Sequence, residues 1–516
     1  MDRKDIFCEI VKCEYDKKFI NIKRIIMNSK EVEKDDLFVA IRGGNKFAGE
    51  ALEKGAYVVY DDKELQIEEK FKEKAFYVSD SVEFLQKFAE KWRKNLNIKV
   101  IGITGSNGKT TVKDMIYHLL SVKYKGKKTI DAENDIVMPG FINTHTHVSM
   151  VAFRSLADDV PDRLSRYIFP LENKLVSRDL VYKGAVYGIL EMVSTGTTTF
   201  ADMYYFEDEV AKAAELIGVR GVLGETVIKN PVADAKEPYG GIEYAEKFIK
   251  QYKNSELVTP AFAPHAPYTV DEEHLKKVTE LSQKYNVPVL MHVAETENEV
   301  KQIKEKYNMT VVEYLNSIGF LTDKVVAAHV IFADDNDIKI LKETNTGIAH
   351  NMVANIKSAK GVSPALKMYD DGLRIGLGTD GPMSGNTLDL VSQFGYVAKV
   401  HKLANKNRAA MPPYKVVEMA TMGGARALHM EDKIGSLEKG KLADIIIIDT
   451  KSLNMQPIYD PYSAIVYSML PTDVKTTIIN GKIIMENKKI KTYDVKKARE
   501  ALKGLEETVK REASKL

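Results

Sequence analysis

The chain has 516 residues, a length at which one hydrophobic core usually gives way to two or more domains. Its 75 lysine and arginine residues nearly balance its 73 aspartate and glutamate residues, so no global field favours nucleic acid or a membrane surface. The two cysteines, Cys8 and Cys13, cannot form the His/Cys/Cys zinc set of the cytidine-deaminase class, and they suit a reducing compartment without disulfides. Since no signal peptide or membrane-spanning apolar run is recognisable, we expect a cytoplasmic protein without membrane or nucleic-acid partners.

The first part of the chain, up to about residue 129, alternates short apolar runs with charged helical stretches. Residues 37–41, 57–60 and 100–103 are expected strands, and residues 82–95 an expected helix. This alternation predicts a small α/β unit. The part contains only one of the ten histidines, so we expect the chemistry to lie further along the chain.

A glycine-rich turn, Thr104-Gly-Ser-Asn-Gly108-Lys109-Thr110-Thr111, follows the expected strand at 98–103 and precedes a helical run. In such a turn Gly105 and Gly108 would let backbone amides cradle a phosphate. Lys109 would reach the terminal phosphates, and Thr110 would hold magnesium. Ile103 stands where the strict phosphate-loop spacing needs its first glycine, so an ordinary strand, tight turn and helix remains the alternative.

These motifs resemble those of the Mur ligases, ATP-dependent enzymes that add amino acids to peptidoglycan precursors. The pattern is most like that of the ligase that adds D-alanyl-D-alanine to UDP-MurNAc-tripeptide. It rests on Asn28-Ser-Lys30, Asp36-Leu-Phe-Val-Ala-Ile-Arg-Gly43, Gly55-Ala56 and Gly105-Ser-Asn-Gly-Lys-Thr-Thr-Val-Lys113. The resemblance implies a Mur-like domain at 1–96 and a fragment of the ATP domain at 97–129. Since the other ligase parts do not follow, we expect at most weak phosphate affinity, with ATP and magnesium bound only if the loop works.

From residue 130 the pattern changes to eight apolar runs, most of them separated by helical stretches. The runs lie at 141–147, 197–203, 220–224, 259–265, 287–292, 325–329, 346–350 and 374–380. Alternating strand and helix imply parallel pairing, and the span is close to the roughly 250 residues of a (β/α)8 barrel. One helix, at 273–285, is expected to begin with a Thr269-x-x-Glu272 capping box. We therefore predict an α/β fold with a TIM-type barrel at 130–425.

Histidines close several of these runs, at the strand ends where such a barrel collects its chemistry. His145 and His147 alternate in one strand, so their side chains point the same way and can bind one ion. With His292 on the fifth strand and Asp380 on the eighth, they offer the nitrogen and oxygen ligands that zinc or iron prefers. A lone buried histidine is more often a core residue, but unrelated core histidines would not all stand at strand ends. The pattern therefore predicts a metal hydrolase.

Other polar residues receive different expectations. Glu295 comes one step past the fifth strand, where a carboxylate could reach a substrate. His350 ends the seventh strand and is expected at most to contact the metal ligands, not the metal. Three more histidines stand in polar helical contexts and are expected at the surface: His274, His401 and His429.

From about residue 130 to 490 the chain resembles the amidohydrolase superfamily, in the branch of 5′-methylthioadenosine and S-adenosylhomocysteine deaminases. The motifs are Pro139-Gly-Phe-Ile-Asn-Thr-His-Thr-His147, Ser194-Thr-Gly-Thr-Thr-Thr-Phe-Ala-Asp202, Ala263-Pro-His-Ala-Pro267, His292-Val-Ala-Glu295, Ala328-His329 and Gly378-Thr-Asp-Gly381. The resemblance implies one divalent ion, zinc or iron, bound by His145, His147, His292 and Asp380. It also implies proton transfer by Glu295, His329 and Asp380, and nucleoside binding by Glu172, His265 and Glu295.

The activity implied is hydrolysis of an adenosine derivative to the inosine derivative and ammonia. In that scheme a protonated Glu295 donates to purine N1, His329 orients the attacking hydroxide, and Asp380 receives its proton. Candidate substrates are 5′-methylthioadenosine, 5′-deoxyadenosine and S-adenosylhomocysteine.

The choice among these substrates depends on the carboxylate of S-adenosylhomocysteine. Family members that take this substrate bind its carboxylate with arginines, but residues 223–257 contain none. Lys229, Lys236 or another subunit of a homo-oligomer could replace them; otherwise the substrate is uncharged, and we favour 5′-methylthioadenosine or 5′-deoxyadenosine.

After the barrel, residues 434–448 and a hairpin at 474–485 around Asn480-Gly481 are expected β structure. They resemble half of the small β-sandwich attached to such barrels, here predicted as a partial sandwich at 426–490. Mur-like sequence stands where the other half would be, so open edges are expected. The last helix, at 491–516, could lie over that gap.

Three alternatives remain open. One is a different amidohydrolase chemistry, such as guanine deamination or triazine dechlorination, on the same metal scaffold. The second is a truncated Mur ligase that retains only nucleotide binding, with its barrel misfolded for lack of sandwich strands. The third is an accidental fusion near Thr129 without a selected function.

Overall fold

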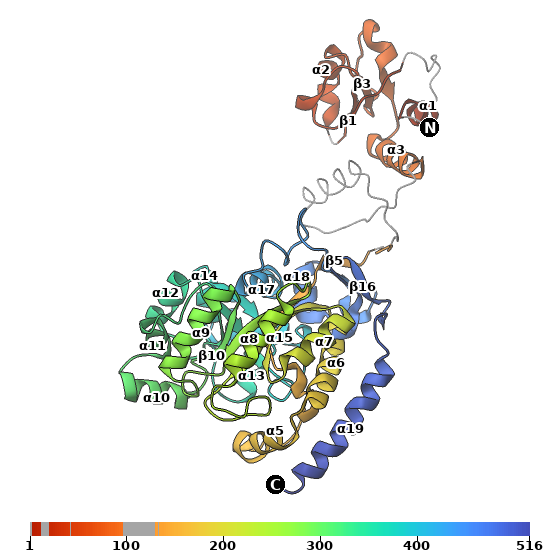
Figure 1. Ribbon diagram of the computed structural model, residues 1–516. Helices are drawn as coiled ribbons and strands as arrows, with labels where there is room; N and C mark the ends of the chain where they lie inside the picture. The colour runs from red at the N-terminus through yellow and green to blue at the C-terminus, as the bar shows by residue number, and fades with distance from the viewer. Residues whose placement is uncertain (1–2, 12–19, 42, 96–129, 133) are drawn as a thin grey trace. The chain divides into compact units, whose positions relative to one another are not determined.

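The computed structural model describes residues 3–11, 20–41, 43–95, 130–132 and 134–516 (Figure 1). These residues fall into two compact units, one containing residues 3–95 and the other residues 132–516. The expected strand at 98–103 and the phosphate-loop residues lie outside the described residues; the latter are Gly105, Gly108, Lys109 and Thr110.

The first unit is a four-stranded parallel sheet with helices on both faces. Its strands are β1 (Ile25–Ile26), β2 (Leu37–Val39), β3 (Tyr57–Tyr60) and β4 (Ala75–Tyr77), side by side in chain order. Its helices are α1 (Arg3–Val11), η2 (Ser29–Glu31), η3 (Gly44–Phe47), α2 (Ala48–Glu53), η4 (Glu69–Lys74) and α3 (Ser81–Asn95). Because strand residues alternate between faces, Leu37 and Val39 pack with α1 and α3 while Phe38 packs with α2. Cys8 is buried in this unit as a free thiol.

Eight parallel strands form the barrel of the second unit. They are β6 (Phe141–Thr146), β7 (Thr197–Tyr204), β8 (Arg220–Val227), β9 (Val258–Pro264), β10 (Val289–Val293), β11 (Val325–His329), β12 (Gly347–His350) and β13 (Arg374–Leu377), each beside the next. The backbone N–H of Asp380 donates to the carbonyl of His145 at 3.0 Å, which joins the last strand to the first. The predicted (β/α)8 barrel is therefore confirmed.

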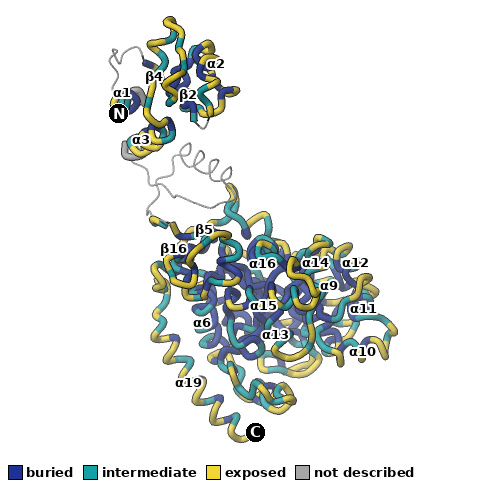
Figure 2. The backbone as a smooth tube through the Cα atoms, turned by 180° about the vertical axis from the view of Figure 1, so that it is seen from behind, coloured by how far each residue is buried: buried dark blue, intermediate teal, exposed yellow. Residues whose placement is uncertain are grey.

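Helices surround the barrel and leave its strands buried (Figure 2). Between β6 and β10 they are η5 (Val148–Phe153), η6 (Leu164–Ile168), α5 (Phe169–Leu175), α6 (Arg178–Ser194), α7 (Glu207–Ile217), α8 (Gly241–Tyr252) and α9 (Glu272–Tyr285). The later ones are α10 (Glu297–Tyr307), α11 (Val311–Ser317), α12 (Asp335–Glu343), α13 (Met352–Lys357), α14 (Ala365–Asp370), α15 (Val391–Ala404), α16 (Pro413–Met419) and α17 (Met422–Ala427).

The capping box expected for α9 is wrong. The Asp271 side chain caps this helix by accepting the backbone N–H of His274 at 3.0 Å. The hydroxyl of Thr269 instead accepts the N–H of Ala266 at 3.1 Å, in the turn that leaves β9. The Thr269 hydroxyl is therefore used in the preceding turn and does not cap the helix.

A five-stranded antiparallel sheet packs against the barrel. Its order is β17 (Lys489–Ile490), β16 (Lys482–Glu486), β15 (Val474–Ile479), β14 (Ile445–Ile448) and β5 (Ile136–Pro139). Strand β5 directly precedes the first barrel strand and pairs with β14, so this edge of the partial sandwich is filled by residues just before the barrel. The Thr477 hydroxyl donates to the carbonyl of Val193 in α6 at 3.0 Å, and the buried Arg220 of β8 pairs with the buried Asp444. The barrel therefore covers one face of the sheet.

The last helix, α19 (Val495–Ala513), packs along α6 with contacts to α5 and η5, not over the sheet (Figure 1). Its apolar seam buries Ala498, Leu505 and Val509 there. The helix could have lain over the gap in the sandwich, but its apolar seam is used against the barrel helices instead. The segments between β14 and β15 are η7 (Leu453–Met455), α18 (Pro461–Ser463), η8 (Ala464–Ser468) and η9 (Pro471–Asp473).

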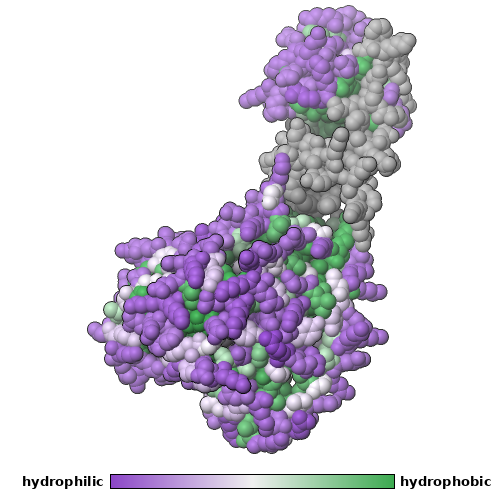
Figure 3. All heavy atoms as spheres, in the orientation of Figure 1, coloured by the Kyte–Doolittle hydropathy of each residue, from purple (hydrophilic) through white to green (hydrophobic). Residues whose placement is uncertain are grey.

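The surface of the second unit is predominantly polar on the face that Figure 3 shows, with small hydrophobic areas between the charged side chains. Within the described residues, every helix is too short or too polar to cross a membrane.

Candidate active site

The four predicted metal ligands converge at the carboxyl end of the barrel. The Nε2 atom of His147 lies 3.3 Å from Nε2 of His292 and 3.4 Å from Oδ1 of Asp380, and Nε2 of His145 lies 3.8 Å from the same oxygen. Zinc bonds of about 2.0–2.1 Å in tetrahedral geometry place neighbouring ligand atoms about 3.3 Å apart. The four side chains could therefore hold one divalent ion between them.

Backbone carbonyls orient two of the histidine rings. Nδ1 of His147 lies 2.6 Å from the carbonyl of Met203, and Nδ1 of His292 lies 2.8 Å from the carbonyl of His265. Because a carbonyl only accepts, each Nδ1 carries the proton and Nε2 presents its lone pair to the centre. Burial holds the pKa of His145 and that of His292 well below the ordinary value, so both rings are neutral, as metal ligation requires.

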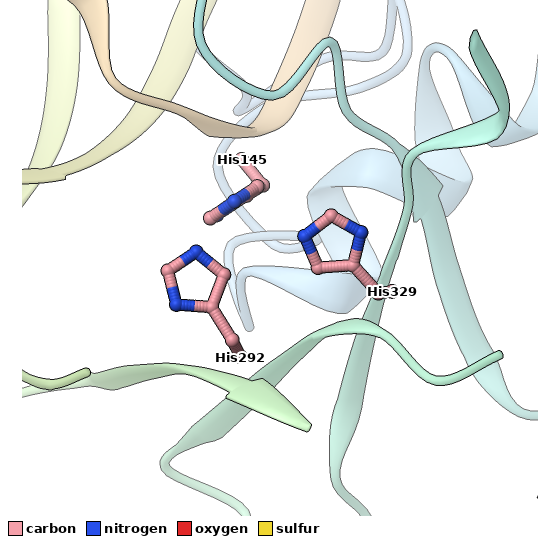
Figure 4. A group of neighbouring side chains, drawn as sticks. All are labelled: His145, His292 and His329. Atoms are coloured by element: carbon pink, nitrogen blue, oxygen red, sulfur yellow. The ribbon is translucent and has the colours of Figure 1, made fainter. Parts of the chain in front are cut away.

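His329 lies beside these ligands at the end of β11. Figure 4 shows the rings of His145, His292 and His329 pointing toward one another from three different strands. The ring nitrogens of these three residues lie within 4.8 Å of one another, so the geometry would also allow His329 as a ligand. Its Nδ1 lies 2.7 Å from Oδ1 of Asn355, while the buried Nε2 has no hydrogen-bond partner among the described residues. That nitrogen is free to act on a reacting group.

The backbone is strained where the strands reach the site. His329 has φ 72° and Asp380 has φ 60°, values in the left-handed region that residues other than glycine rarely adopt. Such a conformation costs on the order of 1–3 kcal/mol and persists where the surroundings enforce it. For Asp380 the enforcing contacts are the hydrogen bond to His145 and the N–H of Gly381, which donates to Oδ1 at 2.5 Å. Closure of the barrel thus aims the carboxylate at the centre.

Glu295 follows β10, and its carboxylate lies between His329 and Lys360. Its Oε1 is 3.7 Å from Nε2 of His329 and 2.5 Å from Nζ of Lys360. The buried carboxylate of Glu299 accepts the N–H groups of Ala294 and Glu295 at 3.0 and 2.8 Å, which fixes the turn.

The expected protonated form of Glu295 is not the one its surroundings favour. Burial raises the pKa of Glu295, but His329 and Lys360 lower it by more. The resulting pKa lies far below the ordinary value of a glutamate. The ligand-free protein therefore holds a carboxylate. Lys360 was not among the predicted site residues, because a lysine in the polar loop after α13 has no pattern that sets it apart from surface lysines.

The two predicted nucleoside contacts, Glu172 and His265, lie near the same centre. Glu172 accepts the hydroxyl of Tyr204 at 2.5 Å, and the Tyr204 ring lies 6.5 Å from the ring of His147. Burial raises the pKa of Glu172. The His265 ring lies 5.0 Å from that of His292, and burial lowers the pKa of His265 to about 4, so this ring is neutral near pH 7.

The remaining histidines are only partly where they were expected. His401 was expected at the surface, but it is 1% exposed, and its Nε2 lies 3.2 Å from Nε2 of the buried His350. It is buried because α15 turns this residue inward, against His350 at the end of β12. His274 and His429 are partly exposed.

The segment after β8 shows no basic side chain directed inward. Lys229 and Lys236 are exposed, and Nζ of Lys229 lies 3.5 Å from the carbonyl of Tyr268. Two buried acids, Glu207 and Glu225, lie nearby instead, with the N–H of Glu207 donating to Oε2 of Glu225 at 3.0 Å. Burial raises the pKa of both well above the ordinary value.

Comparison with known proteins relates residues 136–484 to the amidohydrolase family. A 5-methylthioadenosine/S-adenosylhomocysteine deaminase of Syntrophobacter fumaroxidans is 38% identical over 393 residues, 76% of this chain and 90% of the relative. A 5′-deoxyadenosine deaminase of Methanosarcina mazei is 38% identical over 397 residues, 76% of this chain and 91% of the relative. The crystal structure of a zinc-bound adenosine deaminase from Xanthomonas campestris superimposes with a TM-score of 0.72 at 30% identity, covering 73% of this chain and 87% of that one. The family match begins after the Mur-like segment, whose resemblance stays a prediction.

Proposed function

The chain belongs to the amidohydrolase family, and on this basis we propose that it deaminates a 5′-substituted adenosine by hydrolysis. The products would be the corresponding inosine and ammonia. One observation carries the proposal: His145, His147, His292 and Asp380 meet at one point with Glu295 and His329 beside them. The names of the deaminase relatives support the choice of an adenosine derivative.

The metal proposed is zinc, with iron as the alternative. His145, His147, His292 and Asp380 would hold it, and their three imidazoles and one carboxylate match zinc preferences. When bound, the ion lowers the pKa of water from 15.7 toward about 7 and so makes hydroxide available at neutral pH.

Two side chains would then carry the two protons of the attacking water, and a third would orient it. Glu295, present as a carboxylate, takes one proton and passes it to purine N1, so that negative charge does not build up on the ring. Asp380 takes the second and passes it to the exocyclic nitrogen, which leaves as ammonia. His329, whose other ring nitrogen is held by Asn355, orients the attacking oxygen through its free Nε2. Both protons of water are thereby accounted for.

The substrate proposed is uncharged at its 5′ end. His265 would contact the nucleoside, and Glu172 would accept the ribose hydroxyls. Residues 223–257 offer no arginine for a carboxylate, and the two lysines there that could replace it are exposed. We therefore favour 5′-methylthioadenosine or 5′-deoxyadenosine over S-adenosylhomocysteine.

The test combines a metal analysis with ammonia release. Purified protein should contain about one zinc or iron per chain and release ammonia from 5′-methylthioadenosine, with a lower kcat/KM for S-adenosylhomocysteine. Guanine and a chlorotriazine belong in the same assay, because they represent the alternative chemistries. Protein without stoichiometric metal, or activity on guanine or the triazine alone, would refute the proposal. A large preference for S-adenosylhomocysteine would refute only the choice of substrate.

For the first 129 residues the Mur-like origin is proposed on sequence motifs alone. The alternative of a truncated Mur ligase that retains only nucleotide binding required a misfolded barrel. The barrel here is closed and carries its own sheet. Calorimetry with ATP and magnesium on the full chain, with Lys109→Ala as control, tests whether the phosphate loop binds. We expect weak binding or none.

A further inference from the structure

We propose that Lys360 is a positioning residue for the deamination, one that holds an oxygen of Glu295 so that the other oxygen faces the substrate. The inference rests on the proposed function. It concerns a residue that neither the metal-binding pattern nor the sequence motifs include.

The two oxygens of Glu295 have different surroundings. Oε1 is the oxygen that lies nearest to Nζ of Lys360 and to Nε2 of His329. Among the residues that the structure describes, the hydrogen bond to the Glu295 carboxylate is the one that Lys360 donates to Oε1. The carboxylate is 16% exposed, so one oxygen is restrained while the other remains available to a ligand.

Lys360 is itself held in place. The backbone N–H of Lys360 donates to the carbonyl of Asn355 at 2.9 Å, and Oδ1 of the same Asn355 contacts His329. A few residues on, the buried Ser363 hydroxyl donates to the carbonyl of Val330 at 2.8 Å, next to His329 on the strand end. The loop that carries Lys360 is therefore anchored to the element that carries His329, and the two groups on either side of Oε1 are fixed together.

The Lys360 side chain is suited to restraining a buried acid. It is 22% exposed, against 48% for the surface residue Lys367, so the ion pair is shielded from competing water. Hydrogen bonds between ionised groups are about twice as strong as neutral ones and tightly directed. A proton that moves between Glu295 and purine N1 requires the carboxylate within about 3 Å and correctly aimed, and small misplacements are costly in rate. Loss of Lys360 should thus reduce turnover through Glu295.

Lys360→Met is the primary test, measured with 5′-methylthioadenosine and zinc-loaded protein. We expect kcat to fall about tenfold or more, while KM, metal content and melting temperature stay close to the wild type. Lys360→Arg should recover most of the rate, because it restores a cation at Oε1. Lys367→Met, an exposed lysine paired with Asp371, is the matched control and should leave all four quantities unchanged. Should Lys360→Met not fold, Lys360→Gln gives the same comparison.

A double-mutant cycle separates positioning from a merely structural role. If Lys360 acts through Glu295, adding Lys360→Met to Glu295→Gln causes no further loss of kcat. An active wild type with an equally active Lys360→Met variant would overturn the inference and leave the proposed function standing. So would a tenfold loss that persists in the Glu295→Gln background. A wild type that binds metal but releases no ammonia from any adenosine would overturn both.

Discussion

Replacing Arg220 by methionine should destabilise the barrel unit measurably. Arg220 and its partner Asp444 are 2% and 4% exposed, and the pair joins the barrel strand β8 to the segment that leads into β14. The substitution leaves Asp444 buried with the N–H of Asn480 as a donor at 2.8 Å. Removing one member of a buried ion pair costs about 3–5 kcal/mol. With residues 132–516 unfolding together, at about 2.1 cal/mol/K per residue, the melting temperature falls by roughly 4–6 °C.

Calorimetry at a fixed scan rate measures this shift. Lys247→Met is the control, because Lys247 and Glu243 form an ion pair in which both side chains are more than 70% exposed, at 72% and 75%. Exposed pairs contribute about 0–1 kcal/mol, so this change should move the midpoint by roughly 1 °C or less. Arg220→Met combined with Asp444→Leu should recover much of the loss, since no unpaired charge remains. An Arg220→Met protein that melts with the wild type would show that the pair does not stabilise the sheet against the barrel.

Three further predictions concern the site and its surroundings. Glu295→Gln should keep its metal but lose on the order of a hundredfold in kcat, measured as ammonia release, and an unchanged rate would exclude its role in proton transfer. His292→Ala should lose both bound metal and activity, whereas His274→Ala should keep both; metal analysis after dialysis distinguishes them. Burial lowers the pKa of His401 to about 4 from an ordinary 6.5, so its stabilising effect is complete above pH 6.5 and is lost as the pH falls toward 4. His401→Gln should therefore reduce the dependence of unfolding free energy on pH by up to about 1.4 kcal/mol per unit in that range, and an unaltered slope in urea titrations would contradict it.

The barrel and the convergence of the four candidate metal ligands could be predicted because both follow from short-range patterns. Apolar runs of strand length separated by helical stretches predict a parallel sheet, and eight such runs over about 250 residues favour a barrel, in which the carboxyl ends of the strands meet. His145 and His147 share a face by alternation alone. The positions of His292 and Asp380 then follow from their strands, without any knowledge of side-chain contacts.

Lys360 and His401 could not be predicted in the same way. The position of Lys360 depends on how one loop is anchored near His329, and no local pattern encodes such an anchor. His401 stands in a polar stretch of α15, but which face of that helix is buried depends on tertiary packing, here beside His350 at the end of β12. Strand β5 was missed as a sheet member for a related reason: its partner β14 is about three hundred residues away.

That distant pairing affects how the protein can be made. During synthesis, β5 and the first barrel strand leave the ribosome long before β14. The barrel can close only after Asp380 has been synthesised, because its N–H donates to the carbonyl of His145. Contacts between such remote positions form slowly and leave strand edges exposed in the meantime. A nascent chain that ends between residues 381 and 444 would carry all four predicted metal ligands but leave β5 without its partner strand, and it should aggregate or require a chaperone.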